Sequence, residues 1–299
     1  MSFWKRSGWL ALCLLAVLVA FLMQIIGSIV GGFAFNLQEM RKLEAQGMLT
    51  QAAIDDVNNR LLTDGMGLCI LWGHIMMLVC FAIWFYFGCG RPKLRQAKVA
   101  FAPKSLLVIL LVAGGMCFCT NFALPVVSLI IPESIMNHYI ELMEQAGFGV
   151  DTLAIIASVL LAPFGEEFIC RGVVFHYAKK MVADMDNRRA AFWIANSVQA
   201  LMFGILHGNI VQGTYAFFMG LALGYLRHRY NSLAPAIMAH MLINATSSFV
   251  WEPIATRLPE SYVVYAIGAV IFLAVTFVGL RIGGKAEQQT VAVAVAEEA

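Results

Sequence analysis

The chain has 299 residues, of which 61% are hydrophobic and only 13% are charged, with a formal net charge of +2 and a mean hydropathy of +0.78. A soluble domain carries nearer to 25% charged residues, so the composition excludes an ordinary soluble enzyme, and no nucleic-acid partner is expected. The apolar residues form runs of about 20, the length that spans a hydrocarbon core, rather than the short alternating segments of a transmembrane barrel. The sequence therefore predicts an all-α, polytopic integral membrane protein in a lipid bilayer.

About eight membrane spans are expected in chain order. The first apolar run follows Lys5 and Arg6, as a signal peptide would, but it is too long and no small-residue cleavage site follows it. It is therefore predicted to remain as the first span. The expected spans are residues 9–35, 66–88, 105–131, 149–177, 190–207, 212–225, 232–250 and 262–280.

The segments between these spans predict the orientation of the chain. With the N-terminus inside, the cytoplasmic segments contain 15 of the 20 basic residues and the outer segments contain four, while Arg171 lies within a span. The positive-inside rule therefore predicts that both termini are cytoplasmic. Outside the membrane lie a polar segment, 36–65, and a short acidic connection, 132–148.

The chain is expected to divide into three parts. Residues 1–148 hold three N-terminal helices and the outer polar segment, 149–283 form a core of five spans that opens toward the cytoplasm, and 284–299 form a disordered cytoplasmic tail. No internal repeat is visible. The seven cysteines lie mostly in apolar runs without a Cys-x-x-Cys pair, so they are interpreted as small hydrophobic residues.

The fourth expected span contains two adjacent carboxylates and an arginine, Glu166, Glu167 and Arg171, in an otherwise apolar run. Each charge costs about 2.5–3.5 kcal/mol to insert, so charges within a span indicate a functional site. Glu167 and Arg171 are four residues apart and share a helix face, where they can pair. Glu166 points about 100° away and is left free for chemistry. The alternative is a structural ion-pair cluster that fixes helix packing.

Two further spans carry polar groups that could meet Glu166. His207 ends the fifth span, and His240 and Asn244 share one face of the seventh. Each could be structural, because a histidine can bond a backbone carbonyl and a His–Asn pair can join two helices. Together they suit hydrolysis of a peptide bond: a carboxylate held by a histidine activates water, and His and Asn donate to the oxyanion. Alternatively, two histidines and a glutamate can hold a catalytic zinc ion.

Spans one and three contain single polar residues, Gln24 and Asn121, that form no comparable group. His74 in the second span is isolated and is taken as structural. The predicted depths of Glu166, His207 and His240 in the membrane differ, which makes it difficult for the three side chains to meet. At 1.5 Å per residue, Glu166 and His240 lie about 18 and 12 Å from the cytoplasmic boundary, but His207 lies about 24 Å from it. Convergence therefore requires tilted helices or a fifth span that begins outside the bilayer.

Three motifs occur in order along successive helices: Glu-Glu-x-x-x-Arg at 166–171, Phe-x-x-x-His at 203–207 and His-x-x-x-Asn at 240–244, with Gly220 and Gly224 in the helix between the last two. The set resembles the CPBP family of intramembrane proteases. This group includes the type II CAAX prenyl endopeptidases and the bacterial Abi-type proteins. The resemblance covers about a third of the chain.

The resemblance implies an intramembrane endopeptidase, in the plasma membrane of a bacterium, that cleaves a membrane-associated peptide or protein. It implies one role for each residue of the motifs: catalytic base for Glu166, assisted by His207; oxyanion donors for His240 and Asn244; a supporting ion pair for Glu167 and Arg171.

Two other functions could use the same polar groups. The first is a non-catalytic membrane protein that binds a peptide or a partner membrane protein. The second is a proton-coupled transporter in which Glu166 and the histidines relay protons, although the lack of repeats argues against it. An intact six-residue set favours the enzyme, because binding alone would not need the set to be complete.

The preferred mechanism requires no cofactor, and a divalent metal such as zinc is the alternative. A zinc site needs further partners that fix its ligands, and the spare carboxylate, Glu167, is expected to be committed to Arg171. His240 shares its face with Asn244, which suits a pair of donors better than a lone ligand. These two points favour a general base, Glu166, that is held by His207.

Overall fold

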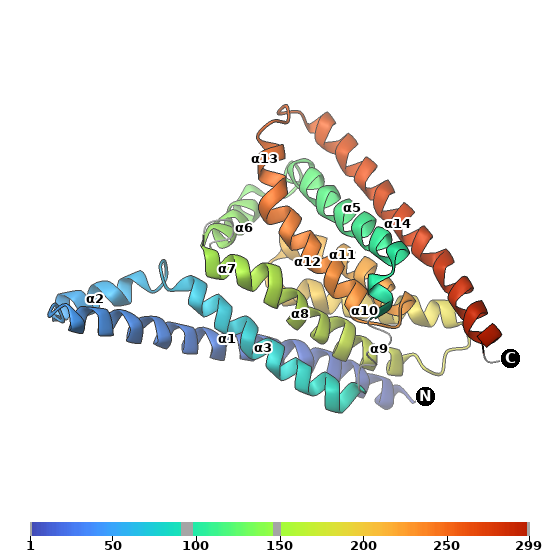
Figure 1. Ribbon diagram of the computed structural model, residues 1–299, viewed down its shortest axis with the longest axis horizontal. Coiled ribbons are helices and arrows are strands. Elements are labelled where there is room, and N and C mark those ends of the chain that lie inside the picture. Colours follow the sequence, from blue (N-terminus) through green and yellow to red (C-terminus); the bar gives the residue numbers. More distant parts are fainter. Residues whose placement is uncertain (1, 91–97, 146–150, 298–299) are drawn as a thin grey trace.

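The computed structural model describes residues 2–90, 98–145 and 151–297, with side chains left out at 99 and 284–297. Every regular element in these ranges is a helix, as predicted for an all-α protein (Figure 1). Six helical stretches are long and apolar enough to cross a membrane: Phe3–Ala45 (α1), Met66–Cys89 (α3 and η1), Pro103–Val127 (α5), Thr152–Met181 (α7 to α9), Arg188–Leu206 (α10) and Tyr262–Gly283 (in α14). The polytopic membrane class is therefore confirmed.

The expected number of eight spans is not confirmed. The sixth expected span lies in α11 (Ile210–Arg229), where Gln212 near the start and a basic C-terminal turn reduce the mean hydropathy. The seventh lies in α12 (Ala234–Thr246), which is only 13 residues long because the backbone then changes to a π-helical turn, η5 (Ser247–Trp251). Neither helix is among the six candidates.

The shorter elements connect or cover the long ones. They are α2 (Gln51–Arg60), η2 (Val99–Phe101), α6 (Glu133–Gln145) and α13 (Glu252–Ala255). The last helix, α14 (Tyr262–Glu297), packs along α5. It also includes most of the residues that were assigned to the tail. The division of the chain into three parts stays a prediction. All seven cysteines are free, as expected.

Both termini lie at the same end of the bundle (Figure 1). At this end Arg6 forms an ion pair of 2.9 Å with Asp184, and the Arg229 side chain donates to the Gly283 carbonyl at 2.9 Å. These contacts join four segments that were all predicted to be cytoplasmic. The polar segment 36–65, with α2, projects from the opposite end of α1 and α3.

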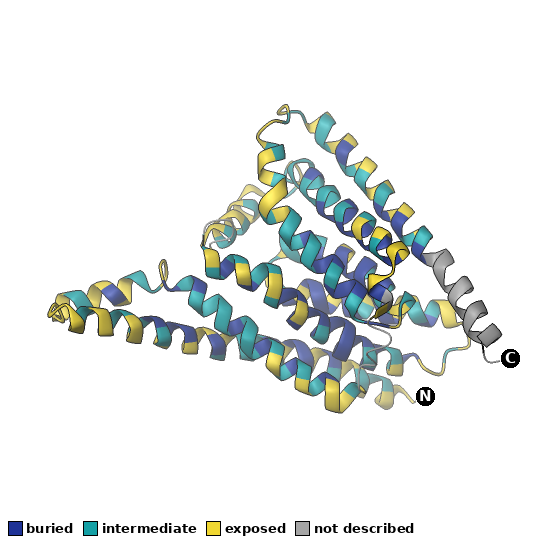
Figure 2. Ribbon diagram, viewed as in Figure 1, coloured by how far each residue is buried: buried dark blue, intermediate teal, exposed yellow. Residues whose placement is uncertain are grey.

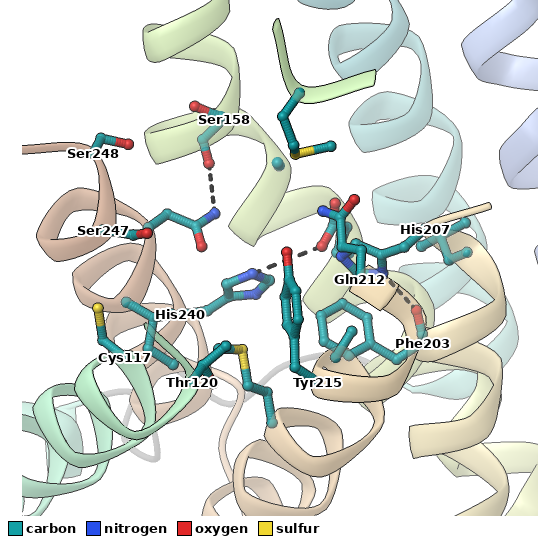
Figure 3. A pocket seen from close by; sticks show the side chains of 18 of the residues that line it. Cys117, Thr120, Ser158, Phe203, His207, Gln212, Tyr215, His240, Ser247 and Ser248 are labelled. Carbon is teal, nitrogen blue, oxygen red and sulfur yellow. Dashed lines mark hydrogen bonds and ion pairs between the residues drawn. The ribbon is translucent and has the colours of Figure 1, made fainter. Parts of the chain in front are cut away.

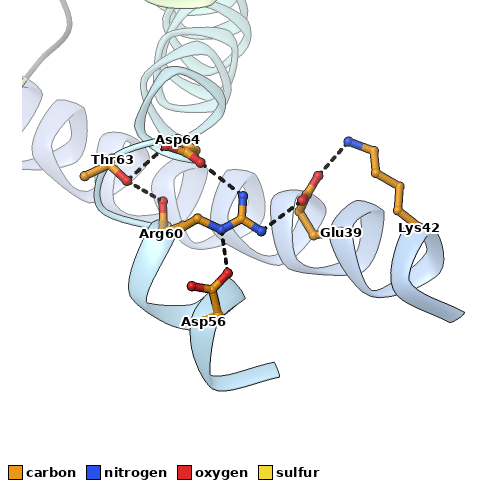
Figure 4. A network of polar contacts seen from close by, with 6 residues as sticks. All are labelled: Glu39, Lys42, Asp56, Arg60, Thr63 and Asp64. Atoms are coloured by element: carbon orange, nitrogen blue, oxygen red, sulfur yellow. Dashed lines mark hydrogen bonds and ion pairs between the residues drawn. The ribbon is translucent and has the colours of Figure 1, made fainter. Parts of the chain in front are cut away.

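The polar segment contains a network of ion pairs around Arg60 (Figure 4). The network lies outside the expected spans. Its members are joined by contacts of Arg60 with Asp56 at 3.0 Å, Asp64 at 3.1 Å and Glu39 at 3.2 Å, and by a contact of Lys42 with Glu39 at 2.6 Å. Such a network suits a segment in water rather than in lipid.

The pairing of α10 with α11 explains the glycines at 220 and 224. Gln199 Nε2 donates to the Gly220 carbonyl and to Asn196 Oδ1, at 2.8 Å each. A Cβ atom on Gly224 would collide with Asn196 Oδ1, so the two helices can approach this closely only with glycine there. The buried amides fix α10, whose C-terminal end carries His207.

Burial is concentrated around the stretch from α8 (Ala162–Glu167) through π-helical η4 (Phe168–Val174) to α9 (Phe175–Met181) (Figure 2). The outer faces of α1, α2 and α14 are exposed, and the apolar ones suit contact with lipid. The core of the molecule therefore surrounds the charged stretch that the sequence singled out.

Candidate active site

The two adjacent glutamates lie where α8 changes to the π-helical turn η4. Pro163 lies in the first turn of α8, where its missing N–H is tolerated. A second π-helical turn, η3 (Ala157–Leu161), follows α7 (Thr152–Ile156) just upstream. Insertions of this kind shift side chains around the helix axis and are frequent at functional sites. Here Glu166 borders a cavity, while Glu167 is completely buried.

The ion pair predicted between Glu167 and Arg171 is present. Arg171 Nη1 lies 2.9 Å from Glu167 Oε1, and both side chains are fully buried. The same carboxylate oxygen lies 3.0 Å from His240 Nδ1, a contact that was not expected. Glu167 therefore links α8, η4 and α12 through one oxygen atom.

Phe203, the first residue of the Phe-x-x-x-His motif, packs against three other residues of the motifs. Its ring centroid lies 4.3 Å from the Arg171 guanidinium carbon, a cation–π contact in a dry interior. The same ring packs edge-on against His207 and His240, with centroid distances of 4.8 and 5.6 Å. Phe203 thus separates the two histidines and covers the buried arginine.

Each of the two histidines has one ring nitrogen engaged and the other left for the cavity. His240 Nδ1 donates to Glu167, because an ionised carboxylate can only accept, and its Nε2 lies 3.7 Å from Glu166 Oε2. This distance is too long for a direct hydrogen bond. His207 Nδ1 donates to the Phe203 carbonyl at 2.8 Å, so its Nε2 carries the lone pair.

Asn244 lies one turn beyond His240, and its amide is partly committed. Nδ2 donates at 2.8 Å to the backbone carbonyl of Ser158, which belongs to the π-helical turn η3. One of its two N–H groups therefore fixes the side chain between α12 and η3. The second N–H and the carbonyl oxygen can face a ligand.

One cavity of about 500 Å³, a common size for a ligand site, brings four of the predicted residues together (Figure 3). Glu166, His207, His240 and Asn244 line it, whereas Glu167 and Arg171 lie behind it. The depth difficulty is therefore resolved in favour of convergence. The roles of the six residues stay predictions.

The cavity also includes residues that were interpreted as isolated. Gln24, His74 and Asn121 line it, from α1, α3 and α5. His74 does bond its own helix, with Nδ1 2.9 Å from the Ile70 carbonyl, but its ring borders the same space as Glu166. The signal that could have found these residues is the one used for Glu166, a polar group in an apolar span.

The geometry changes the argument about metal. Among the described residues, no group of three or more His, Cys, Asp or Glu side chains is arranged to hold an ion, so Glu166, His207 and His240 do not form a ready-made site. The expected lack of supporting partners, however, is wrong. Both histidines donate Nδ1–H to an acceptor, and Glu167 serves His240 as well as Arg171.

The comparison with protein families gives one match. Residues 148–246 match the model described as type II CAAX prenyl endopeptidase, Rce1-like. The match contains all six predicted site residues and confirms the resemblance over this segment, and at the level of the family it supports CAAX endopeptidase activity in an integral membrane protein. Comparisons with curated proteins and with solved structures give no match.

Proposed function

We propose that this chain, through its Rce1-like segment at 148–246, is an endopeptidase that cleaves a membrane-associated peptide or protein in a bacterial plasma membrane. The observation that carries the proposal is the convergence of Glu166, two histidines and Asn244 on one cavity. The cavity lies among helices that are apolar enough to span a bilayer, so a substrate must reach it within or beside the membrane.

In the proposed reaction Glu166 is the general base. Its carboxylate borders the cavity, so a water molecule in the cavity can donate a hydrogen bond to it. Glu166 takes one proton from water as the water oxygen attacks the peptide carbonyl carbon. It then returns the proton to the amide nitrogen as the carbon–nitrogen bond breaks. His207 Nε2, held by the bond of Nδ1 to Phe203, accepts a hydrogen bond from the same water.

The oxyanion that forms on the carbonyl oxygen needs donors. Asn244 can offer the N–H that Ser158 does not use. His240 can donate from Nε2 only when its ring is protonated, since Nδ1–H is already bonded to Glu167. The buried carboxylate therefore has two tasks, to orient the ring and to share its charge between Arg171 and His240.

The decisive experiment compares cells that carry the wild-type chain with cells that carry Glu166→Gln. Peptide termini in membranes and medium are mapped, and the amount of inserted protein is measured in parallel. We expect the wild-type cleavage products to disappear with Glu166→Gln at unchanged abundance. The matched control is Asp186→Asn, the same chemical change on an exposed residue at the other end of the bundle.

The alternative function is a non-catalytic protein that binds a peptide or a partner membrane protein in the same cavity. It predicts that the Glu166→Gln protein retains its cellular function and that no peptide terminus depends on the chain. That result would replace the protease with a binding protein.

A further inference from the structure

The cavity is closed toward the end of the bundle where the termini lie. Between Glu166 and the basic segment 179–189, no described residue lines the cavity, and nearly every side chain of η4 and α9 up to Ala178 is buried. The neighbouring helices are also buried at this level of the bundle: Leu226 on α11 and Ala236 on α12 are both fully buried. None of the described residues that line the cavity is a lysine or an arginine.

The cavity reaches instead toward the opposite end of the bundle. Its lining there comes from α6, from the first turns of α11 and from the end of α12 with η5 and α13. The residues concerned are Tyr139, Met143, Gln212, Tyr215, Ser247, Ser248 and Glu252. No residue of α6 is buried, so this helix lies on the surface of the molecule.

Charge distinguishes these two ends. The described segments near the cavity mouth, which are 132–145, residue 151 and 251–261, contain six acidic residues and one basic residue. The described segments at the closed end, which are 5–6, 98–104, 179–189, 227–229 and residue 281, contain eleven basic and two acidic residues. Since basic residues flank membrane helices on the cytoplasmic side, the closed end is cytoplasmic and the mouth is not.

We infer that the cavity opens on the non-cytoplasmic side of the membrane, and that its substrate is a peptide segment presented from that side. The inference rests on the proposed function and names its substrate class. It replaces the expectation of a core that opens toward the cytoplasm. A segment that enters from the cytoplasmic end would have to pass the buried layer of η4, α9, α11 and α12.

The excess of acidic residues at the cavity mouth also predicts which peptide segments bind there most readily. A surface with five more acidic than basic residues attracts cations and raises their local concentration. Glu252 is one of these acidic residues, and it lines the cavity itself. The favoured segment is therefore one with lysine or arginine near the cleaved bond, rather than an acidic one.

Accessibility of single thiols tests the inference. Ser247→Cys places a thiol of similar size at the exposed mouth, and Asp186→Cys places one on the closed end. Each variant is treated with a membrane-impermeant maleimide in intact cells and after permeabilisation, and the labelling of the parent chain, with its own seven cysteines, is subtracted. We expect Ser247→Cys to react in intact cells and Asp186→Cys to react only after permeabilisation.

Three results would overturn the inference: labelling of Asp186→Cys in intact cells, labelling of Ser247→Cys only after permeabilisation, or no labelling of Ser247→Cys under either condition. The readout does not depend on catalysis, so it is separate from the outcome for Glu166→Gln. Loss of the proposed protease activity would leave a cavity of known orientation, and a reversed orientation would leave the protease with a cytoplasmic substrate.

Discussion

Two arginines in this molecule contact carboxylates, and their surroundings are opposite. Arg60 lies in the polar segment, is 37% exposed and contacts Asp56, Asp64 and Glu39 (Figure 4). Arg171 is fully buried and has one carboxylate, Glu167, together with the Phe203 ring. The arginine with more partners depends on them less, because water can replace them. The buried arginine has no such replacement.

The largest effect is expected for Arg171→Ala. Removing the arginine leaves Glu167 as a buried charge with only His240 beside it, which costs about 3–5 kcal/mol of unfolding free energy. The amount of folded protein should fall sharply. Adding Glu167→Ala should restore part of it, because the uncompensated charge is then gone.

The measurement is the yield of folded protein and its thermal midpoint in detergent. Two residues that do not interact would give additive losses, so a double variant as depleted as the sum of the two singles would contradict the pair. The contact of Glu167 with His240 limits the recovery, because the double variant leaves His240 Nδ1 without its acceptor.

The second effect concerns catalysis rather than stability. His240→Ala and Asn244→Ala should each slow turnover by about 10²–10³-fold, the range for loss of one oxyanion donor. Both residues border the cavity, so the protein should stay folded where Arg171→Ala does not. Turnover is followed from the cleavage products that depend on Glu166. A rate that survives both substitutions would remove the oxyanion role from this face of α12.

Sequence reasoning found the parts of the site that local spacing determines. The pairing of Glu167 with Arg171 follows from a separation of four residues, and it survives although η4 is π-helical. Four of the six residues singled out in the spans line one cavity. A charge or histidine that is costly to insert is visible in the sequence without any knowledge of packing.

What could not be predicted depends on how distant helices are rotated against each other. The bond between His240 and Glu167 joins positions 73 residues apart, and it requires π-helical turns that no local signal announced. His74 looked isolated because its neighbours in space come from other helices. The direction in which the cavity opens could not be predicted, because depth along single helices does not show which end the packed core closes.

A smaller effect is expected from removal of metal. A strong chelator should lower the activity only modestly, since the described side chains do not form a group that could hold an ion. The purified protein is assayed for bound zinc and for turnover, with and without the chelator.

The metal prediction has a clear contrary outcome because both histidines have the supporting bonds of metal ligands. Stoichiometric zinc that is lost together with activity in His240→Ala would make the site a metal site. Full recovery of activity on adding zinc to the chelated wild-type protein would lead to the same conclusion.

The smallest effect is expected for Arg60→Ala. Its three carboxylate partners are exposed or at the surface, so water and salt can replace the arginine. The shift of the thermal midpoint should be several-fold smaller than that of Arg171→Ala and should shrink further at high ionic strength. A shift equal to that of Arg171→Ala, or one that is independent of salt, would show that exposure does not distinguish the two arginines.

The network around Arg60 should also respond to acid in a defined direction. Hydrogen bonds from Lys42 and then from Arg60 hold the pKa of Glu39 below its ordinary value. A carboxylate with a lowered pKa in the folded state stabilises the protein above its unfolded pKa of about 4.3 and loses that contribution as the pH falls through the folded value. The difference between wild type and Arg60→Ala should therefore disappear below that range.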